Sequence, residues 1–406
     1  MKLHRNLVFA AVDAIQEIFN DGKYADKVLQ GTLKRDKRWG ARDRSFIAET
    51  VYDIVRWKRL YVEIAEVKEP FDRQKAFRLF TVWATLRGIT VPDWKQLEDT
   101  PTRRIKGKFD ELSKIRKFRE SIPDWLDELG EKELGKKWDA EIAALNQQAD
   151  VILRVNTLKT DIDKLQAILF DLDLETEKIK GYPYALKLKE RANVFQTQAF
   201  QDGWFEVQDA SSQLVAEFLE VQPGMRVVDA CAGAGGKALH LAALMENKGQ
   251  LIALDIYANK LNELKRRAKR AGAFNIETRL IESTKVVKKL HEKADRVLID
   301  APCSGLGVLR RNPDAKWKLQ PEFMENIKKT QAEILDNYSK MVKPGGKMIY
   351  ATCSILPSEN EKQIKDFLKR EEGKDFTFAK EKKIMPAASG FDGFYMALLE
   401  KKQIDK

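Results

Sequence analysis

The alternation of short apolar runs with helical stretches in the second half of the chain constrains the fold more than any other feature of the sequence. After about residue 205, the runs 225–228, 250–254, 296–299 and 348–350 have the length and the β-branched or aromatic content of buried parallel strands. Helical stretches separate them, such as the one predicted over 238–245. This alternation predicts a doubly wound α/β domain, which we expect to span residues 206–406.

The first half of the chain shows a different periodicity. Residues 7–15 and 44–57 carry apolar side chains at spacings of three and four, which predicts amphipathic helices and an all-helical bundle over residues 1–135. The apolar run 151–155, a predicted helix over 161–169 and the alternating stretch 185–189 predict a small α/β module over residues 136–205.

The charge of the chain suggests a polyanionic partner. Its 406 residues include 73 Lys and Arg against 62 Asp and Glu, a net charge of +11. A solvated surface of mixed charge also explains much of this excess. Eight basic residues crowd one short stretch, namely Arg103, Arg104, Lys106, Lys108, Lys114, Arg116, Lys117 and Arg119. This stretch is either a contact to nucleic-acid phosphates or an exposed linker.

Three cysteines and three histidines at long spacings fit neither a disulfide framework nor a metal-finger pattern, so we expect no bound metal. The first residues lack the apolar stretch of a signal peptide, and nowhere do 18 apolar residues run together. We therefore expect a cytoplasmic, monomeric protein without a membrane segment.

A glycine-rich turn follows the first predicted strand of the α/β domain, at Cys-Ala-Gly-Ala-Gly-Gly-Lys (231–237). Glycines allow the backbone to approach a ligand closely, and the following helix amino terminus offers free N–H donors. The next strand ends at Asp255, about 20 residues on, where an acid can accept hydrogen bonds from a ribose diol. Both NAD and S-adenosylmethionine carry such a diol, so this pattern alone predicts either cofactor.

Two cysteines stand at the ends of two later predicted strands, in Asp300-Ala-Pro-Cys303-Ser-Gly and Ala-Thr-Cys353-Ser. Because the carboxyl ends of parallel strands meet at the ligand-binding edge of such a sheet, both thiols and Asp300 would converge on one crevice. The alternative is that these cysteines simply pack in the core, although a packing thiol is expected within a strand rather than at its tip.

The two thiols favour S-adenosylmethionine over NAD, because hydride transfer needs no thiol whereas methylation of a pyrimidine carbon does. Cytosine C5 becomes nucleophilic only after a thiolate adds to C6, and a carboxyl group at N3 helps as charge develops there. Afterwards the C5 proton must leave, which calls for a second group that acts as a base.

Several motifs closely resemble the RNA cytosine-5 methyltransferases of the Sun/NOP2-like family. They are Val-Gln-Asp-Ala-Ser-Ser at 207–212, the turn 229–237, the stretch 300–314, Lys-Pro-Gly-Gly at 343–346, the stretch 351–355 with Glu-Asn-Glu at 359–361, and 392–397. Residues 41–57 are similar to the NusB-like helical RNA-binding domain of the bacterial 16S rRNA methyltransferases B, and 154–158 to their middle module. The resemblance implies a Rossmann-like methyltransferase domain and an RNA partner, 16S rRNA.

The resemblance also implies roles for individual residues. In this family the cysteine after Thr is the nucleophile, here Cys353, and the Pro-Cys cysteine, here Cys303, helps to release the product. The DNA cytosine-5 enzymes use the reverse arrangement, so the pattern favours RNA. Asp300 would contact the cytosine ring. The expected cofactor-binding residues are Cys231, Ala232, Gly233, Ala234, Gly235, Gly236, Lys237, Asp255, Glu282 and Asp300, and the expected substrate-binding residues are Lys237, Arg310 and Arg311.

Three positions depart from the family's usual cofactor loop, Gly233, Ala234 and Ala238. Glycine tolerates more backbone conformations than the residue it replaces, so we expect the shape of the loop to survive. Two other interpretations remain open: a non-catalytic RNA-binding or ribosome-assembly protein on a methyltransferase scaffold, and a tRNA cytosine-5 methyltransferase. The retained Cys353, Cys303 and Asp300 speak against the first.

Overall fold

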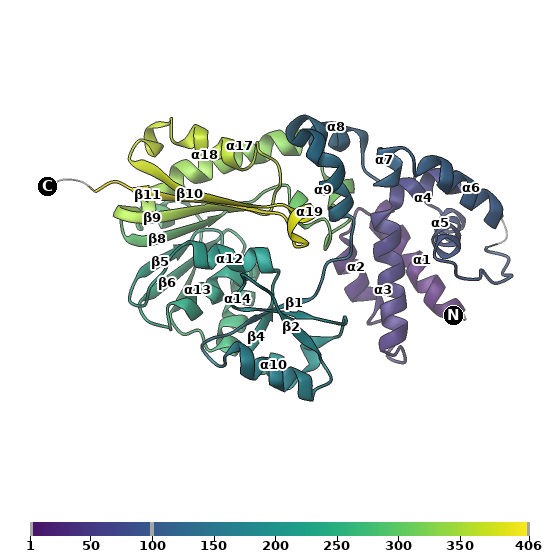
Figure 1. Ribbon diagram of the computed structural model, residues 1–406, viewed down its shortest axis with the longest axis horizontal. Coiled ribbons are helices and arrows are strands. Elements are labelled where there is room, and N and C mark those ends of the chain that lie inside the picture. Colours follow the sequence, from purple (N-terminus) through teal and green to yellow (C-terminus); the bar gives the residue numbers. More distant parts are fainter. Residues whose placement is uncertain (1–2, 98–100, 404–406) are drawn as a thin grey trace. The chain divides into compact units, whose positions relative to one another are not determined.

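The computed structural model describes residues 3–97 and 101–403, which divide into two compact units. The helical unit comprises the residues up to Gln147 together with the segment Leu309–Pro321. The sheet unit comprises Gln148–Val308 and the residues from Glu322 onward. In Figure 1 the helical unit is mostly purple and blue, and the sheet unit runs from teal to yellow.

The helical unit confirms the predicted all-helical first half. On α1, the residues Val8, Ala11, Val12 and Ile15 are fully buried, as their spacing of three and four predicts. The helices are α1 (Arg5–Asn20), α2 (Ala25–Thr32), α3 (Ala41–Arg56), α4 (Lys58–Ala65), α5 (Arg73–Leu86), α6 (Thr102–Leu112), α7 (Arg116–Arg119), α8 (Asp124–Leu134), α9 (Trp138–Leu145) and the short α16 (Ala315–Lys318).

The segment Leu309–Pro321 packs into this unit although it lies far away in the sequence. The Trp317 indole donates a hydrogen bond to the Val55 carbonyl (2.7 Å), and its ring packs against the core of the unit. The Lys316 side chain is buried, and its Nζ donates to the Asn146 side-chain oxygen (3.0 Å). This segment therefore completes the helical unit, which the sequence did not predict.

A small antiparallel sheet with the order β2-β3-β1-β4 opens the sheet unit. Its strands are β1 (Ile152–Val155), β2 (Thr176–Lys178), β3 (Ala185–Leu188) and β4 (Phe205–Val207), and its helices are α10 (Ile162–Asp171) and the short α11 (Gln198–Gln201). Leu165 and Leu169 of α10 pack with Leu153 and Leu186 of the sheet. This arrangement confirms the predicted small α/β module.

A seven-stranded sheet with the order β10-β11-β9-β8-β5-β6-β7 forms the rest of the sheet unit. Its first five strands in the chain run parallel, and β11 and β10 add an antiparallel edge. The strands are β5 (Arg226–Asp229), β6 (Gln250–Asp255), β7 (Ile276–Leu280), β8 (Ala294–Asp300), β9 (Val342–Thr352), β10 (Phe376–Ile384) and β11 (Phe394–Lys401).

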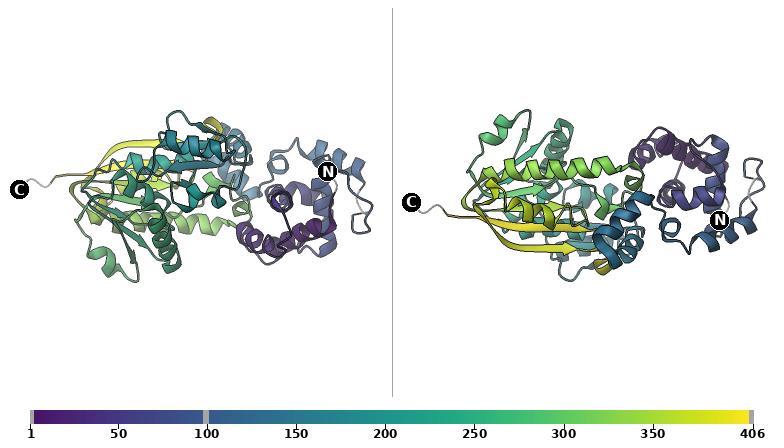
Figure 2. Two further views of the ribbon diagram at one scale, coloured as in Figure 1. Left: turned by 90° about the horizontal axis from the view of Figure 1, so that it is seen from below. Right: turned by 90° about the horizontal axis from the view of Figure 1, so that it is seen from above.

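Helices cover both faces of this sheet, as Figures 1 and 2 show. Alternate residues of β5 face opposite sides: Val227 packs with helices α12 to α14, and Val228 packs with the layer of α15, α17 and α18. The helices are α12 (Ala210–Phe218), α13 (Gly236–Leu244), α14 (Ala258–Ala271), α15 (Thr284–Lys288), α17 (Pro321–Tyr338), α18 (Glu361–Phe367) and the short α19 (Pro386–Ser389). The predicted doubly wound architecture is confirmed.

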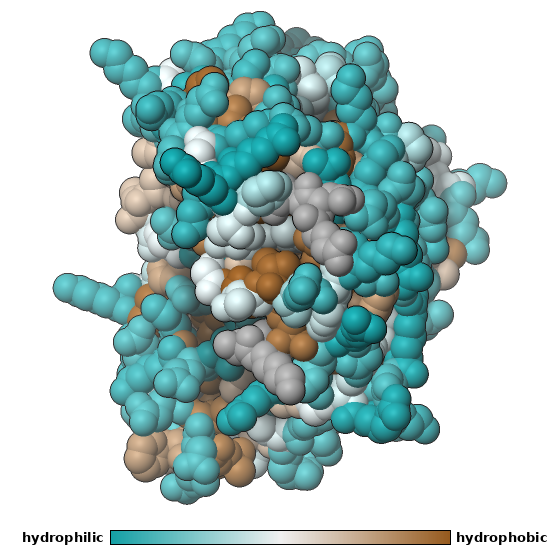
Figure 3. All heavy atoms as spheres, turned by 90° about the vertical axis from the view of Figure 1, so that its right-hand side faces the viewer, coloured by the Kyte–Doolittle hydropathy of each residue, from teal (hydrophilic) through white to brown (hydrophobic). Residues whose placement is uncertain are grey.

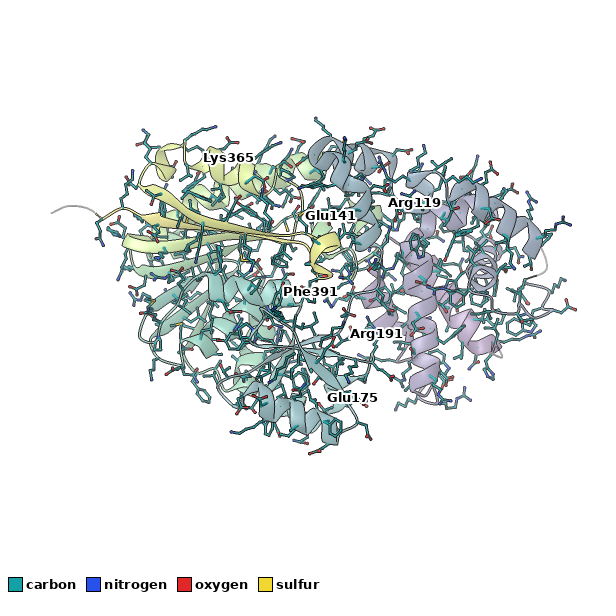
Figure 4. The ribbon with its side chains drawn as sticks, in the orientation of Figure 1. Arg119, Glu141, Glu175, Arg191, Lys365 and Phe391 are labelled. Atoms are coloured by element: carbon teal, nitrogen blue, oxygen red, sulfur yellow. The ribbon has the colours of Figure 1, made fainter. Side chains whose placement is uncertain are left out.

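The small module is fixed against the large sheet by buried contacts. Arg154 of β1 is 2% exposed and donates hydrogen bonds to the Gln208 side chain and to the Gly236 carbonyl, at the start of α13. Burial lowers the pKa of Arg154 to about 10, so this guanidinium stays charged at neutral pH. Phe391, labelled in Figure 4, packs edge-on against Tyr182, with ring centroids 5.2 Å apart.

Among the helices of residues 3–97 and 101–403, none has the length and hydropathy needed to span a membrane.

Candidate active site

The glycine-rich turn between β5 and α13 lies over the end of β6. Gly233 and Gly235 have φ angles of +54° and +88°, in the left-handed region that favours glycine. The Gly233 N–H donates to one oxygen of Asp255, and the Tyr257 N–H donates to the other, both at 2.8 Å. Asp255 thus holds the turn in shape, and the departures from the family's loop leave a well-formed cradle.

A cavity of about 550 Å³ lies at the carboxyl ends of β5, β6, β8 and β9. Its walls include Asp229, the turn residues 231–234, 236 and 237, Asp255, Asp300, Cys303 and Cys353. A cavity of this size, with a glycine turn and a helix amino terminus on one side, fits a nucleoside cofactor such as S-adenosylmethionine. The structure therefore brings together most of the residues predicted for the site.

Asp229, at the end of β5, was not among the predicted site residues. It is 1% exposed, and neither carboxylate oxygen receives a hydrogen bond of ordinary geometry from the described residues. Burial, reinforced by the nearby Asp300 carboxylate, raises the pKa of Asp229 to about 7. A buried acid on a cavity wall fits a positively charged or hydrogen-bond-donating group of the cofactor. Its place directly before the glycine turn was the sequence signal.

Lys237 and Asp300 form an ion pair inside the cavity. The Lys237 ammonium, from the first turn of α13, donates to Asp300 Oδ2 at 2.7 Å and lies over the Phe394 ring. Although burial works against the charge, the Asp300 carboxylate raises the pKa of Lys237 above its ordinary value. Lys237 is therefore cationic at neutral pH, and it keeps the Asp300 carboxylate pinned at the end of β8.

The sulfur atoms of Cys303 and Cys353 lie 3.3 Å apart. Cys303 follows β8 and Cys353 follows β9, so the parallel pairing of these two strands brings the thiols together. The hydrogen bond with Cys353, together with burial, raises the pKa of Cys303 well above its ordinary value. Cys303 is therefore a neutral thiol at neutral pH.

The remaining predicted residues lie elsewhere or have other surroundings. Cys231 lines the cavity, and burial raises the pKa of its thiol well above the ordinary value, which suits packing. Glu282 is exposed, and its neighbour Ile281 lines the cavity instead. Arg310 and Arg311 lie in the segment that packs into the helical unit. The roles of Glu282, Arg310 and Arg311 stay predictions.

Five of the eight residues in the basic stretch take part in ion pairs. Arg104 and Lys108 both pair with Glu66. Arg116, Lys117 and Arg119 pair with acids of α8 and α9 or with Glu120, and Arg119 is labelled in Figure 4. Arg103, Lys106 and Lys114 are exposed. The side of the helical unit seen in Figure 3 is mostly hydrophilic.

Two family models match the chain. The family described as 16S rRNA methyltransferase RsmB/F matches residues 216–400, which include Cys303, Cys353 and most of the cavity wall. The ferredoxin-like domain of the RsmF/B-like methyltransferases matches residues 122–195. The RsmB/F family is S-adenosylmethionine-dependent, which confirms the expected cofactor.

Individual relatives and a solved structure agree with these matches. The ribosomal RNA small subunit methyltransferase B of Escherichia coli O6:K15:H31 is 34% identical over 99% of this chain and 100% of its own length. A probable ribosomal RNA small subunit methyltransferase B of Synechocystis is 39% identical over 62% of this chain and 57% of its own length. The crystal structure of PH0851 matches 99% of this chain and 100% of its own, with 27% identity and a TM-score of 0.84. The resemblance seen in the sequence is confirmed: the chain belongs to the family of ribosomal RNA small subunit methyltransferases B and is an rRNA methyltransferase.

Proposed function

We propose that this protein methylates C5 of a cytosine in 16S rRNA through a covalent enzyme–RNA intermediate. The observation that carries the proposal is the pair of thiols, 3.3 Å apart, in the same cavity as the Lys237–Asp300 ion pair and the glycine turn. Of the cofactors that fit this turn, S-adenosylmethionine supplies an electrophilic methyl group. The residues expected to hold it are Asp229, Asp255 and the turn 231–237.

The proposed reaction begins with the Cys353 thiolate, which forms a bond to cytosine C6. The electron pair of the C5–C6 double bond moves toward C5 and the ring, where Asp300, held by Lys237, contacts the base. The C5 carbon then accepts the methyl group. Lys237 stays cationic throughout and is placed near the developing charge.

The second half of the reaction requires a base, which we assign to Cys303. Once the Cys353 sulfur is bonded to carbon, it no longer raises the pKa of Cys303, and only burial and the nearby Glu359 side chain still raise it. Cys303 then ionises more easily and releases its proton to solvent, and its thiolate takes the proton from C5. The C5–H electrons restore the C5–C6 double bond, the bond from sulfur to C6 breaks, and Cys353 leaves as a thiolate.

For RNA binding we propose that residues 1–135, which lie within the helical unit, form a NusB-like domain, followed by a middle module over 136–205 and the methyltransferase domain over 206–406. Exposed basic residues of the helical unit, Arg42 among them, would contact RNA phosphates. Arg310 and Arg311 would contribute to substrate binding.

The test is methylation in vitro of 16S rRNA and of a tRNA pool by the purified protein with S-adenosylmethionine, followed by bisulfite sequencing. We expect a single new bisulfite-resistant cytosine in 16S rRNA. Methyl incorporation without any resistant cytosine would reject the C5 assignment. Resistance confined to tRNA would replace the rRNA substrate with tRNA.

A further inference from the structure

The motif Glu359-Asn360-Glu361 has no role in the mechanism proposed above. Glu359 lies in the turn before α18, the helix that carries Lys365 in Figure 4, and its side chain is fully buried. Four donors surround its carboxylate. Oε1 accepts from the hydroxyls of Ser304 and Ser354, both at 2.5 Å. Oε2 accepts from the Ser304 N–H (2.8 Å) and from the Gln331 amide (3.1 Å).

Three of these four donors come from the two loops that carry the thiols. Ser304 directly follows Cys303, and Ser354 directly follows Cys353. Gln331, on α17, also donates to the carbonyl of Pro302, the residue before Cys303 (2.9 Å). One carboxylate therefore joins the ends of β8 and β9 beyond their last paired residues.

Asn360 binds the second loop on its own. Its side-chain oxygen accepts from the Thr352 hydroxyl (2.5 Å), and its amide donates to the Ser354 carbonyl (3.0 Å). It reaches only the Cys353 loop, whereas Glu359 reaches both loops. Asn360 can therefore shape one loop, whereas Glu359 can fix the position of one loop relative to the other.

We propose that Glu359 is a positioning residue that sets the distance between the Cys303 and Cys353 thiols. A fully buried acid is costly to keep in a protein, and here each oxygen of Glu359 accepts from two donors, three of the four from the two cysteine loops. A glutamine at this position would turn an NH₂ group toward at least one of those donors and would leave it unpaired. The expected effect on kcat rests on the proposed covalent mechanism, whereas the expected effect on the distance between the two thiols does not.

The experiment compares Glu359→Gln with Glu361→Gln, the same substitution two residues on. Glu361 pairs with the exposed Lys383, and among the described residues no hydrogen bond joins its side chain to either cysteine loop. The probe is phenylarsine oxide, whose trivalent arsenic binds two adjacent thiols with loss of one water molecule. Peptide mapping identifies the captured cysteines and so excludes capture by Cys231. No RNA and no cofactor are present, so the result does not depend on the proposed function.

We expect the wild type and Glu361→Gln to bridge Cys303 and Cys353 with equal affinity and Glu359→Gln to bind the arsenical at least tenfold more weakly. In methylation assays, we expect Glu359→Gln to lower kcat by at least tenfold with little change in KM for RNA. Circular dichroism shows whether each variant is folded. Equal arsenical binding by folded Glu359→Gln and Glu361→Gln would overturn the proposal.

Should Glu359→Gln fail to fold, the double variant Ser304→Ala/Ser354→Ala decides the question, because it removes both hydroxyl donors and keeps the acid. Weaker bridging by this variant supports the proposal, and wild-type bridging overturns it.

Discussion

The Sγ atoms of Cys303 and Cys353 are 3.3 Å apart, although 50 residues separate them in the chain. Parallel pairing of β8 with β9, in which Asp300 stands opposite Ala351, brings the two strand ends level. A nucleophile and a base that act in turn on adjacent carbons of one ring need this kind of proximity.

Replacement of Cys303 and replacement of Cys353 should block different steps of the reaction. We expect Cys353→Ala to abolish methylation without forming an adduct, and Cys303→Ala to form the adduct but not to resolve it. The Cys303→Ala protein would then run as a protein–RNA complex on denaturing gels. Trapping by Cys353→Ala instead would exchange the two roles. Normal turnover by both variants would leave the cysteines as packing residues only.

Replacement of Asp255 should weaken cofactor binding. Asp255→Ala removes a carboxylate that we expect to bind the ribose and that accepts the Gly233 and Tyr257 N–H groups, so we expect a loss of about 1.5–3 kcal/mol in binding free energy. Isothermal titration calorimetry with S-adenosylmethionine measures it. Glu322→Ala is the matched control, because Glu322 is exposed and is not among the residues that line the cavity. Equal losses in the two variants would contradict the prediction.

The buried Asp229 should make stability depend on pH. Its pKa is raised from 3.8 to about 7, so between about pH 4 and 7 the folded protein holds a proton that the unfolded chain has lost. The free energy of unfolding should therefore fall as pH rises through this window, by on the order of 4 kcal/mol from this group, and level off above pH 7. Urea denaturation of wild type and Asp229→Asn at pH 5 and pH 8 isolates the effect. The same pH dependence in both proteins would contradict the prediction.

Exposed basic residues of the helical unit should bind RNA phosphates, and the ion-paired ones should contribute less. We expect Arg103→Gln/Lys106→Gln/Lys114→Gln to weaken RNA binding and to reduce the slope of log affinity against log salt by about 2. Fluorescence anisotropy over a range of KCl concentrations measures both quantities. Arg104→Gln/Lys108→Gln is the control, because both residues pair with Glu66. A larger change in the control would move the RNA contact to those residues.

The repeating parts of the fold were predictable because periodicity reports which side chains are buried. The parallel strands β5, β6, β8 and β9 follow from their apolar runs, and the helices α1 and α3 follow from apolar spacing. The convergence of Asp255, Asp300, Cys303 and Cys353 followed from the rule that parallel strands end at one edge. Periodicity is silent on pairing between distant segments, so neither the Lys237–Asp300 ion pair nor the four donors around Glu359 was foreseen. Asp229 was not predicted, because the last residue of a buried strand can either belong to the core or line the site, and the sequence does not distinguish the two.

Because Leu309–Pro321 belongs to the helical unit, this unit is built from two segments that are far apart in the sequence. During synthesis, the first nine helices leave the ribosome long before Trp317 and Lys316 are made, and until then the Val55 carbonyl and the Asn146 side chain lack these partners. Vectorial folding of the helical unit can therefore finish only after both β8 and the Cys303 loop have emerged. A gene truncated before residue 309 would encode a helical unit that lacks its last segment. Deletion of the residues up to Gln147 would instead remove the residues against which Lys316 and Trp317 pack.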